Sequence, residues 1–288
     1  MQCRNQIKSN LSKRVPVPLK PSSWTENPTY LEDTTKMPEN VFKPFEGNTF
    51  NFSCHKDIPC FNKCCAKLRL ILTPYDILRM KKRLDLSSDD FLEKYTDTVI
   101  ESHSRFPMVR LKMDAEKNET CPFVTEQGCA IYEDRPGACR LYPVGRASTM
   151  VDGEKDAREK FFIVSEAHCS GFNEGKSWTL DEWLRHEGVS EYNAMNDQWL
   201  EIITSPKDLG AKDATKKFQM FFMASYNLDK FREFIFKSKF FDLFEIKADL
   251  KDKLASDDVD LMKFGFEWLK FSLFGEKTIE TKFHAAQS

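Results

Sequence analysis

The stretch Cys54-His-Lys-Asp-Ile-Pro-Cys-Phe-Asn-Lys-Cys-Cys65 carries four cysteines and decides how the rest of the chain is interpreted. A second group follows at Cys121, Cys129 and Cys139, and Cys169 comes after it. The first residues contain no apolar stretch of signal-peptide length, so we expect a reducing compartment in which thiols persist. Grouped reduced cysteines are typical of metal ligands rather than of a disulfide framework.

Composition narrows the class of protein. The chain has 288 residues, of which 41% are hydrophobic, enough for a core that does not depend on metal alone. The formal net charge is only -2, which argues against binding nucleic acid or an anionic membrane by bulk electrostatics. No apolar run is long enough to span a bilayer. We therefore expect a cytoplasmic, soluble protein whose partners are a metal ion or cluster and, in addition, a protein substrate or partner.

Three segments of the chain differ in amino-acid composition and in hydrophobic pattern. Residues 1–40 are rich in proline and polar residues, which predicts an extended arm, with Cys3 as a bystander thiol. Residues 41–175 predict a cysteine-cluster metal-binding domain, and residues 176–288 a Phe-rich helical domain. The expected fold class is α+β, with a small irregular cysteine-rich domain of short strands and helices followed by a mainly helical C-terminal domain.

Helix-capping residues and alternating apolar residues predict individual helices and strands. Within the cysteine-rich segment, Thr73 followed by Pro74 predicts a capped helix, and Ser87 or Ser88 a second one. Alternation predicts strands over 106–113 and 161–164. Further helix signals lie at Thr179 with Glu182, at Ser190 before Pro206, at Asn227, and from Ser256 to Gly275. Phenylalanines recur at helical spacing along this part, which indicates core more often than a ligand pocket.

The spacing of the first group limits how its sulfurs are shared. Cys60 and Cys64 are four residues apart, so in a helix or tight turn they face the same side and can share a metal. Cys64 and Cys65 are adjacent, and adjacent side chains diverge. They serve different metal atoms of a cluster, or two neighbouring sites, or else one of them is merely packed.

Both zinc and iron are compatible with this count of cysteines. Eight cysteines satisfy two closed zinc sites, and a four-iron cluster also takes four. The paired C-x2-C signature of zinc ribbons is absent, whereas the Cys121-Pro122 dipeptide is similar to the end of bacterial ferredoxin motifs. The balance favours an iron–sulfur cluster of the four-iron type, with zinc as the alternative.

Basic and aromatic residues near the second group suggest contacts with the metal centre. Arg135, Arg140 and Arg146 would favour thiolate over thiol, or else are ordinary surface arginines. Tyr132 or Tyr142 could donate a hydrogen bond to sulfur, although a structural role is commoner. We assign Arg135, Arg140 and Tyr142 as candidate cofactor-binding residues.

Two histidines, His55 and His168, each neighbour a cysteine. They are candidates for nitrogen ligands or proton carriers. A solitary histidine beside a metal ligand more often forms a hydrogen bond to that ligand, without touching the metal, or faces solvent. A papain-like nucleophile would require one privileged thiol, which eight grouped cysteines fit poorly.

Several motifs together carry a family resemblance. They are the cysteine-rich stretch 52–65, Leu72-Thr-Pro-Tyr-Asp-Ile-Leu78, Cys121-Pro-Phe123, Cys129-Ala-Ile-Tyr-Glu-Asp-Arg-Pro136, Cys139-Arg-Leu-Tyr-Pro143 and Cys169-Ser-Gly171. This pattern resembles the YkgJ-type cysteine-cluster family, also called CxxCxxCC, described as a zinc- or iron-chelating domain. The spacing departs from the commonest form, since five residues separate Cys54 from Cys60 and three separate Cys60 from Cys64.

The resemblance implies a set of metal ligands and a choice of functions. The implied ligands are Cys54, Cys60, Cys64, Cys65, Cys121, Cys129, Cys139 and Cys169. One relative of the family is the flagellin lysine-N-methylase, which implies methyl transfer from S-adenosylmethionine at an iron–sulfur centre. The expected function is therefore a metal-binding protein with such a centre, supporting redox or methyl transfer chemistry as an oxidoreductase or methyltransferase. The alternative is a zinc-stapled interaction module or a metal-handling protein without catalysis.

Overall fold

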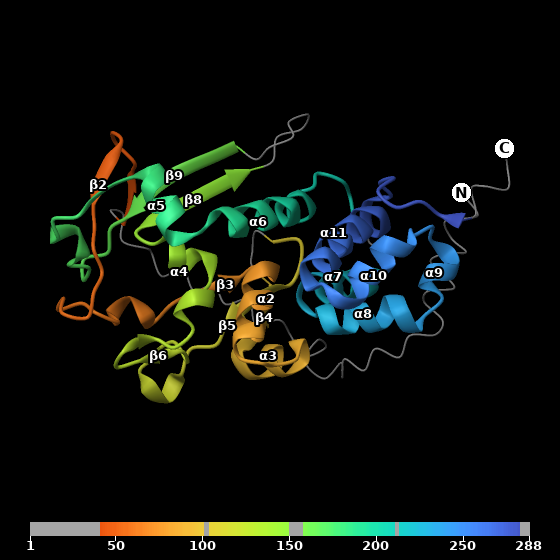
Figure 1. Cartoon of the computed structure of the whole chain (residues 1–288), viewed down its shortest axis with the longest axis horizontal. Coiled ribbons are helices and arrows are strands. Elements are labelled where there is room, and N and C mark those ends of the chain that lie inside the picture. Colours follow the sequence, from red (N-terminus) through yellow and green to blue (C-terminus); the bar gives the residue numbers. More distant parts are fainter. Residues whose placement is uncertain (1–40, 101–103, 150–157, 211–212, 283–288) are drawn as a thin grey trace. The chain divides into compact units, whose positions relative to one another are not determined.

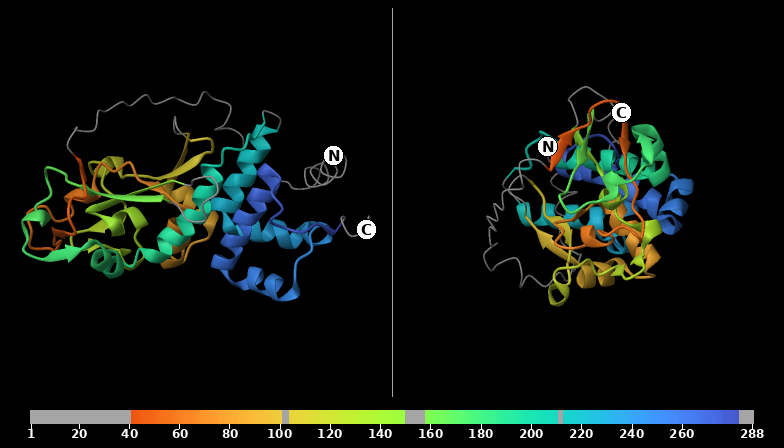
Figure 2. Two further views of the ribbon diagram at one scale, coloured as in Figure 1. Left: turned by 90° about the horizontal axis from the view of Figure 1, so that it is seen from above. Right: turned by 90° about the vertical axis from the view of Figure 1, so that its left-hand side faces the viewer.

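The computed structural model describes residues 41–100, 104–149, 158–210 and 213–282. The predicted arm 1–40, with Cys3, lies outside them. The chain divides into two compact bodies. Of the described residues, the cysteine-bearing body holds 41–100, 104, 108–149 and 158–205, and the helical body holds 105–107, 206–210 and 213–282. Figures 1 and 2 show the helices and strands of both bodies, which are described one after the other.

The cysteine-bearing body holds short antiparallel sheets. One has the order β1 (Phe42–Pro44), β9 (Arg158–Val164), β8 (Val144–Thr149), and another the order β3 (Ile71–Leu72), β5 (Met108–Leu111), β4 (Thr96–Val99). Two-stranded pairs join β10 (Ser177–Thr179) to β2 (Thr49–Asn51) and β6 (Val124–Thr125) to β7 (Gly128–Cys129). The strands are short because the chain turns repeatedly around the cysteines.

The helices of this body are α2 (Pro74–Arg83), α3 (Ser88–Tyr95), α4 (Gly137–Leu141), α5 (Leu180–Glu187) and α6 (Ser190–Ile203). Of these, α2, α3, α5 and α6 begin where the sequence predicts, and the short α4 was not predicted. Single 3₁₀ turns are η2 (Lys63–Cys65), η3 (Ala115–Lys117), η4 (Tyr132–Asp134) and η5 (Gly171–Asn173). Capping boxes close the first turns of α2 and α5, with Thr73 and Thr179 as caps. Gly188, at a φ of 62°, ends α5 in the left-handed conformation.

A compact apolar cluster lies behind the cysteine loops. Phe52, Leu141 and Trp183 are buried in it, and the rings of Phe52 and Trp183 meet edge to face at 5.6 Å. The indole nitrogen of Trp183 donates to the carbonyl of Leu141 at 2.9 Å, and that of Trp178 to Phe52 at 2.8 Å. These bonds tie α5 and β10 to the segments that carry cysteines.

The helical body consists of α7 (Ala214–Tyr226), α8 (Leu228–Lys237), α9 (Phe240–Leu243), α10 (Ala248–Ser256) and α11 (Asp258–Phe274). Its aromatic stripe forms core, since Phe231, Phe240 and Trp268 are almost entirely buried. The ring of Phe231 lies 5.3 Å from that of Trp268. α11 approaches α7 closely at Gly265, where an added Cβ would lie 3.0 Å from the carbonyl oxygen of Ala224.

The predicted fold class is confirmed: a mixed α+β region with short strands is followed by a mostly helical part. Thr73, Ser87, Thr179 and Asn227 all cap helices as expected. The boundary at 175/176 falls within the cysteine-bearing body, which also takes in α5 and α6, and the proposed domain division stays a prediction. Within the described ranges, no helix combines the length and apolarity that crossing a bilayer demands.

Candidate metal centre

The segment from Cys54 to Cys65 is a succession of tight turns. Backbone N–H groups at 58, 61, 63 and 65 each donate to the carbonyl three residues earlier, at distances of 2.9 to 3.3 Å. Ile58 is buried and anchors the middle of the segment, and Asn62 adopts a left-handed φ of 66° before η2. This chain of turns takes up the spacing that is longer than the commonest family pattern.

One group of cysteines is gathered where this segment meets the Cys169 region. The backbone N–H of Ser170 donates to the Cys60 sulfur at 3.1 Å, and the N–H of Ser53 donates to the Gly171 carbonyl at 3.1 Å. Cys54 and Cys169 each directly neighbour a residue of this contact. Only glycine fits at 171, because a Cβ there would lie 2.7 Å from the Phe52 ring and 2.9 Å from the Ser53 carbonyl oxygen.

A second group is gathered on the other side of η2. The N–H of Cys121 donates to the carbonyl of Cys65 at 2.7 Å, next to a bridge between Ala66 and Thr120. The short β6–β7 hairpin then pairs Val124 with Cys129. β7 begins at Gly128, whose φ of 109° lies in the region that glycine tolerates best.

Cys139 enters the site on α4, whose first turn is held by Asp76. The Asp76 carboxylate accepts N–H bonds from Gly137 and from Thr73, both at 2.8 Å. The carboxylate is buried, and burial raises its pKa, opposed by these two donors. Asp76 thus joins the first turns of α2 and α4 and fixes the position of Cys139.

Burial and the charge of neighbouring thiols shift the pKa of several cysteines. Burial raises the pKa of Cys54 to about 11, reinforced by charge on Cys64, Cys60 and Cys169. Burial raises the pKa of Cys139 to about 12, reinforced by Cys121.

Cys64 and Cys65 behave as a coupled pair. The Cys65 thiol donates a hydrogen bond to the Cys64 sulfur, which lowers the pKa of Cys64 to about 7 and raises that of Cys65. The adjacent sulfurs therefore touch, although their side chains start from different faces of η2.

Backbone donors point at several sulfurs. Burial raises the pKa of Cys121, Cys129 and Cys169, and N–H groups that bond to each sulfur act in the opposite direction. The donors are Phe123 and Val124 to Cys121, Ile131 to Cys129, and Gly171 to Cys169. N–H groups aimed at sulfur stabilise the thiolate form that a metal needs.

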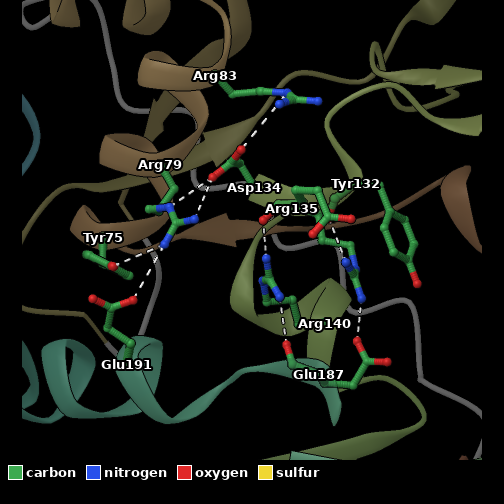
Figure 3. Close-up of polar contacts among 10 residues, drawn as sticks. Tyr75, Arg79, Arg83, Tyr132, Asp134, Arg135, Arg140, Glu187 and Glu191 are labelled. Atoms are coloured by element: carbon green, nitrogen blue, oxygen red, sulfur yellow. Dashed lines mark hydrogen bonds and ion pairs between the residues drawn. The ribbon is translucent and has the colours of Figure 1, made fainter. Parts of the chain in front are cut away.

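Arg135 and Arg140 are committed to protein partners (Figure 3). Arg135 forms a buried ion pair with Glu187 and donates to the Tyr132 carbonyl at 2.6 Å. Arg140 donates to the carbonyls of Glu187, at 2.6 Å, and Glu133. A separate pair in the same view joins Arg79 to Asp134 at 2.7 Å.

Arg146 is bound elsewhere, to Asp197 at 2.6 Å and Glu159 at 2.5 Å. Arg146 therefore joins β8 to β9 and α6, whereas Arg135 and Arg140 support the segment that carries Cys139. A direct cofactor contact by Arg135 or Arg140 stays a prediction.

Tyr142 has a different environment. Its hydroxyl is buried, and burial together with the neighbouring Cys169 and Glu166 raises its pKa. A buried hydroxyl beside a sulfur can donate to a ligand-bound thiolate, which keeps Tyr142 as a candidate.

The two histidines lie at the surface. His55 is near Glu174 at 3.4 Å and His168 near Glu166 at 3.7 Å, and both side chains are well exposed. Sequence reasoning missed Glu187 as a support, because its partner Arg135 is distant in the chain. Asp76 could have been found, since it occupies the third position of the capping box that Thr73 opens.

The eight cysteines of the described residues are all free thiols, and no disulfide joins them. Within the described ranges no three His, Cys, Asp or Glu side chains already have the spacing of an ion's ligands. The donor set itself fits zinc or iron, because sulfur ligands with backbone N–H support suit both metals.

Comparison with known proteins agrees with this chemistry. Residues 53–170 match the family CxxCxxCC, described as a "putative zinc- or iron-chelating domain". Neither the curated proteins nor the solved structures include a match to the chain. The match spans all eight grouped cysteines, from Cys54 to Cys169.

Proposed function

We propose that this protein carries a cysteine-ligated iron–sulfur centre of the four-iron type and uses it in redox chemistry. The observation that carries the proposal is the set of backbone N–H groups directed at Cys60, Cys121, Cys129 and Cys169. Hydrogen bonds to sulfur are a principal means by which a protein sets the reduction potential of such a centre.

The chain's own residues would supply ligands and their support. The eight grouped cysteines provide the thiolates, and an iron–sulfur centre, when bound, accepts and releases single electrons. The buried Arg135–Glu187 pair and Asp76 fix the loops that carry the second group. Tyr142, whose hydroxyl neighbours Cys169, would donate its hydroxyl hydrogen to that sulfur.

Zinc is the second candidate, favoured by the number of thiols. Eight cysteines satisfy two closed four-ligand zinc sites, which stabilise a fold and perform no chemistry. In that case the protein is an interaction module or a metal-handling protein. Methyl transfer from S-adenosylmethionine remains an expectation from the family resemblance. The hydrogen bonds to the cysteine sulfurs bear on the metal and not on a methyl donor.

Anaerobic purification separates iron from zinc. We expect a brown protein with broad visible absorption that bleaches on reduction, and iron and sulfide in stoichiometric amounts. A colourless protein with stoichiometric zinc would contradict the redox proposal and support the zinc reading. Removal of metal without unfolding would identify a metal-handling role.

Substitution of single cysteines tests the ligand assignment. Cys64→Ser and Cys121→Ser should each lower the metal content, while Cys3→Ser, outside the cysteine cluster in sequence, serves as the matched control and should leave it unchanged. Elemental analysis of the three variants beside the parent protein is the measurement. Equal metal in all of them would exclude these cysteines as ligands.

A further inference from the structure

A shallow pocket lies on the surface of the cysteine-bearing body, between the start of β10 and α5. Its volume is about 530 Å³, which is within the usual range of sites that bind small molecules. The residues that line it are Lys176, Ser177, Trp178, Glu182, Arg185 and His186. No cysteine is among them, so this pocket is distinct from the candidate metal centre.

The pocket has two walls, and the fold holds both of them in place. The lining residues of α5 occupy positions i, i+3 and i+4, which share one face of a helix: Glu182, Arg185 and His186. The other wall is formed by β10, which pairs with β2, and by the residue before it. The indole nitrogen of Trp178 donates to the Phe52 carbonyl at 2.8 Å, and the N–H of Phe52 donates to the Lys176 carbonyl at 2.9 Å. This wall is therefore fastened to the backbone two residues before Cys54.

Two cations of the pocket lack an ion-pair partner within the described ranges. Lys176 and Arg185 are both exposed, and neither side chain forms an ion pair there with a carboxylate. The pocket's own carboxylate, on Glu182, accepts the N–H and the hydroxyl of Thr179 at 2.9 and 2.8 Å. These hydrogen bonds, and then the charge of Arg185 from beyond ion-pair distance, lower the pKa of Glu182. Two positive side chains thus stand against one negative group that is already hydrogen-bonded.

The Trp178 ring organises the polar side chains around it. The Lys176 ammonium lies 3.8 Å from the centre of this ring, a cation–π contact that leaves its N–H donors available to a ligand. The His186 ring lies 4.6 Å from the same ring and stacks on Trp183 at 5.9 Å. Lys176 and His186 are therefore held at the pocket by one aromatic platform.

The origin of the cations in two separate segments is what distinguishes this pocket. Basic side chains in the last turn of a helix stabilise the helix itself, so Arg185 and His186 alone would not indicate a ligand. Lys176 belongs to a different segment and lines the same cavity. A guanidinium can bind two oxygens of an anion through its planar fork, and an ammonium can bind a third. The pocket therefore suits an anion that carries several oxygens.

We propose that this pocket binds an anionic small molecule through a phosphate or carboxylate group, held by Lys176 and Arg185. Ser177 and His186 supply further polar groups at the same cavity. The site goes beyond the metal-binding function proposed above and does not depend on it. Phosphate and carboxylate share the anionic oxygens that the two cations recognise, so the experiment has one arm for each.

Isothermal titration calorimetry of the full-length protein, with its metal as purified, tests the proposal at physiological ionic strength, where weak attraction by overall charge is screened. Inorganic phosphate is the probe in one arm and succinate in the other. We expect saturable binding of at least one probe, and the tighter of the two identifies the anionic group. Binding of neither probe would overturn the proposal.

Variants of the two cations locate the binding. Lys176→Gln and Arg185→Gln should each weaken it about tenfold or more, because each removes charged hydrogen-bond donors. Both positions are exposed and lie in different segments, so either variant is informative by itself.

Arg83→Gln is the matched control. Arg83 lies on α2, outside the pocket, is 48% exposed, and its ion pair to Asp134 is long at 4.0 Å. This variant should bind the probe as the parent does. Equal weakening in all three variants would show attraction by overall charge, and unchanged binding in Lys176→Gln and Arg185→Gln would show another site. Either result would overturn the proposal, whereas the metal content of the parent decides the metal-binding function separately.

Discussion

Glu187→Gln is expected to destabilise the cysteine-bearing body strongly. The Glu187 and Arg135 side chains keep only 5% and 10% of their exposure, and the second Glu187 oxygen lies 3.0 Å from the Nδ1 atom of His186. The substitution is nearly isosteric, so it removes the negative charge and leaves the Arg135 guanidinium buried without a counter-charge. The stacking of Arg135 on the Tyr132 ring, at 3.7 Å, remains.

The size of the effect follows from burial. Removing one partner of a buried ion pair costs about 3–5 kcal/mol. The amide oxygen of glutamine still accepts a hydrogen bond, so the expected loss is at the lower end, about 3 kcal/mol. At roughly 2–4 °C per kcal/mol for a body of this size, the melting temperature should fall by about 6–12 °C.

The matched control is Asp97→Asn in the same body. Asp97 is 45% exposed, and its ion pairs to Arg110 and Lys112 are long, at 3.8 and 3.9 Å. Exposed pairs of this kind contribute about 0–1 kcal/mol, so the same change from carboxylate to amide should hardly move the transition. Thermal unfolding followed by circular dichroism measures both. Equal shifts in the two variants would refute the argument that burial makes the Arg135–Glu187 pair important.

Two further predictions concern the helical body and acid stability. Gly265→Ala should destabilise the helical body by about 1–3 kcal/mol, because the new methyl group meets the Ala224 carbonyl oxygen. Denaturant unfolding measures the change, and Ala255→Gly, at an exposed position of α10, is the control for helix propensity. A stabilised Gly265→Ala protein would disprove the close approach. Backbone and side-chain hydrogen bonds from Thr179 lower the pKa of Glu182 below 4.5, so its contribution is complete above pH 4.5 and is lost as the pH falls through the folded-state value. The melting temperature of Glu182→Gln should therefore lie below that of the parent at pH 6 and approach it near pH 3, and a difference independent of pH would contradict the assignment.

Local signals predicted much of the fold. The caps Thr73, Ser87, Thr179 and Asn227 start helices because a side-chain oxygen satisfies N–H groups within its own turn, which requires no distant partner. The aromatic stripe of the last third was correctly interpreted as core. These features depend on residues three or four positions apart, which the sequence displays directly.

Long-range pairings were beyond such reasoning. The sequence predicted that the cysteines converge, but not that Cys60 lies against Ser170 or that Cys65 meets Cys121. Those contacts depend on tertiary packing of segments more than fifty residues apart. The same holds for Glu187, whose burial against Arg135 has no local signal in α5.

The carboxylate of Asp76 closes the first turn of one helix and reaches the first turn of another, which has a practical consequence for dissecting the protein. A peptide that begins after residue 83 would retain Cys121, Cys129 and Cys139 yet lack the acceptor for the Gly137 N–H. Excised fragments are therefore poor substitutes for the intact chain, and a fragment that keeps the first turn of α4 as it is here must extend back at least to Thr73.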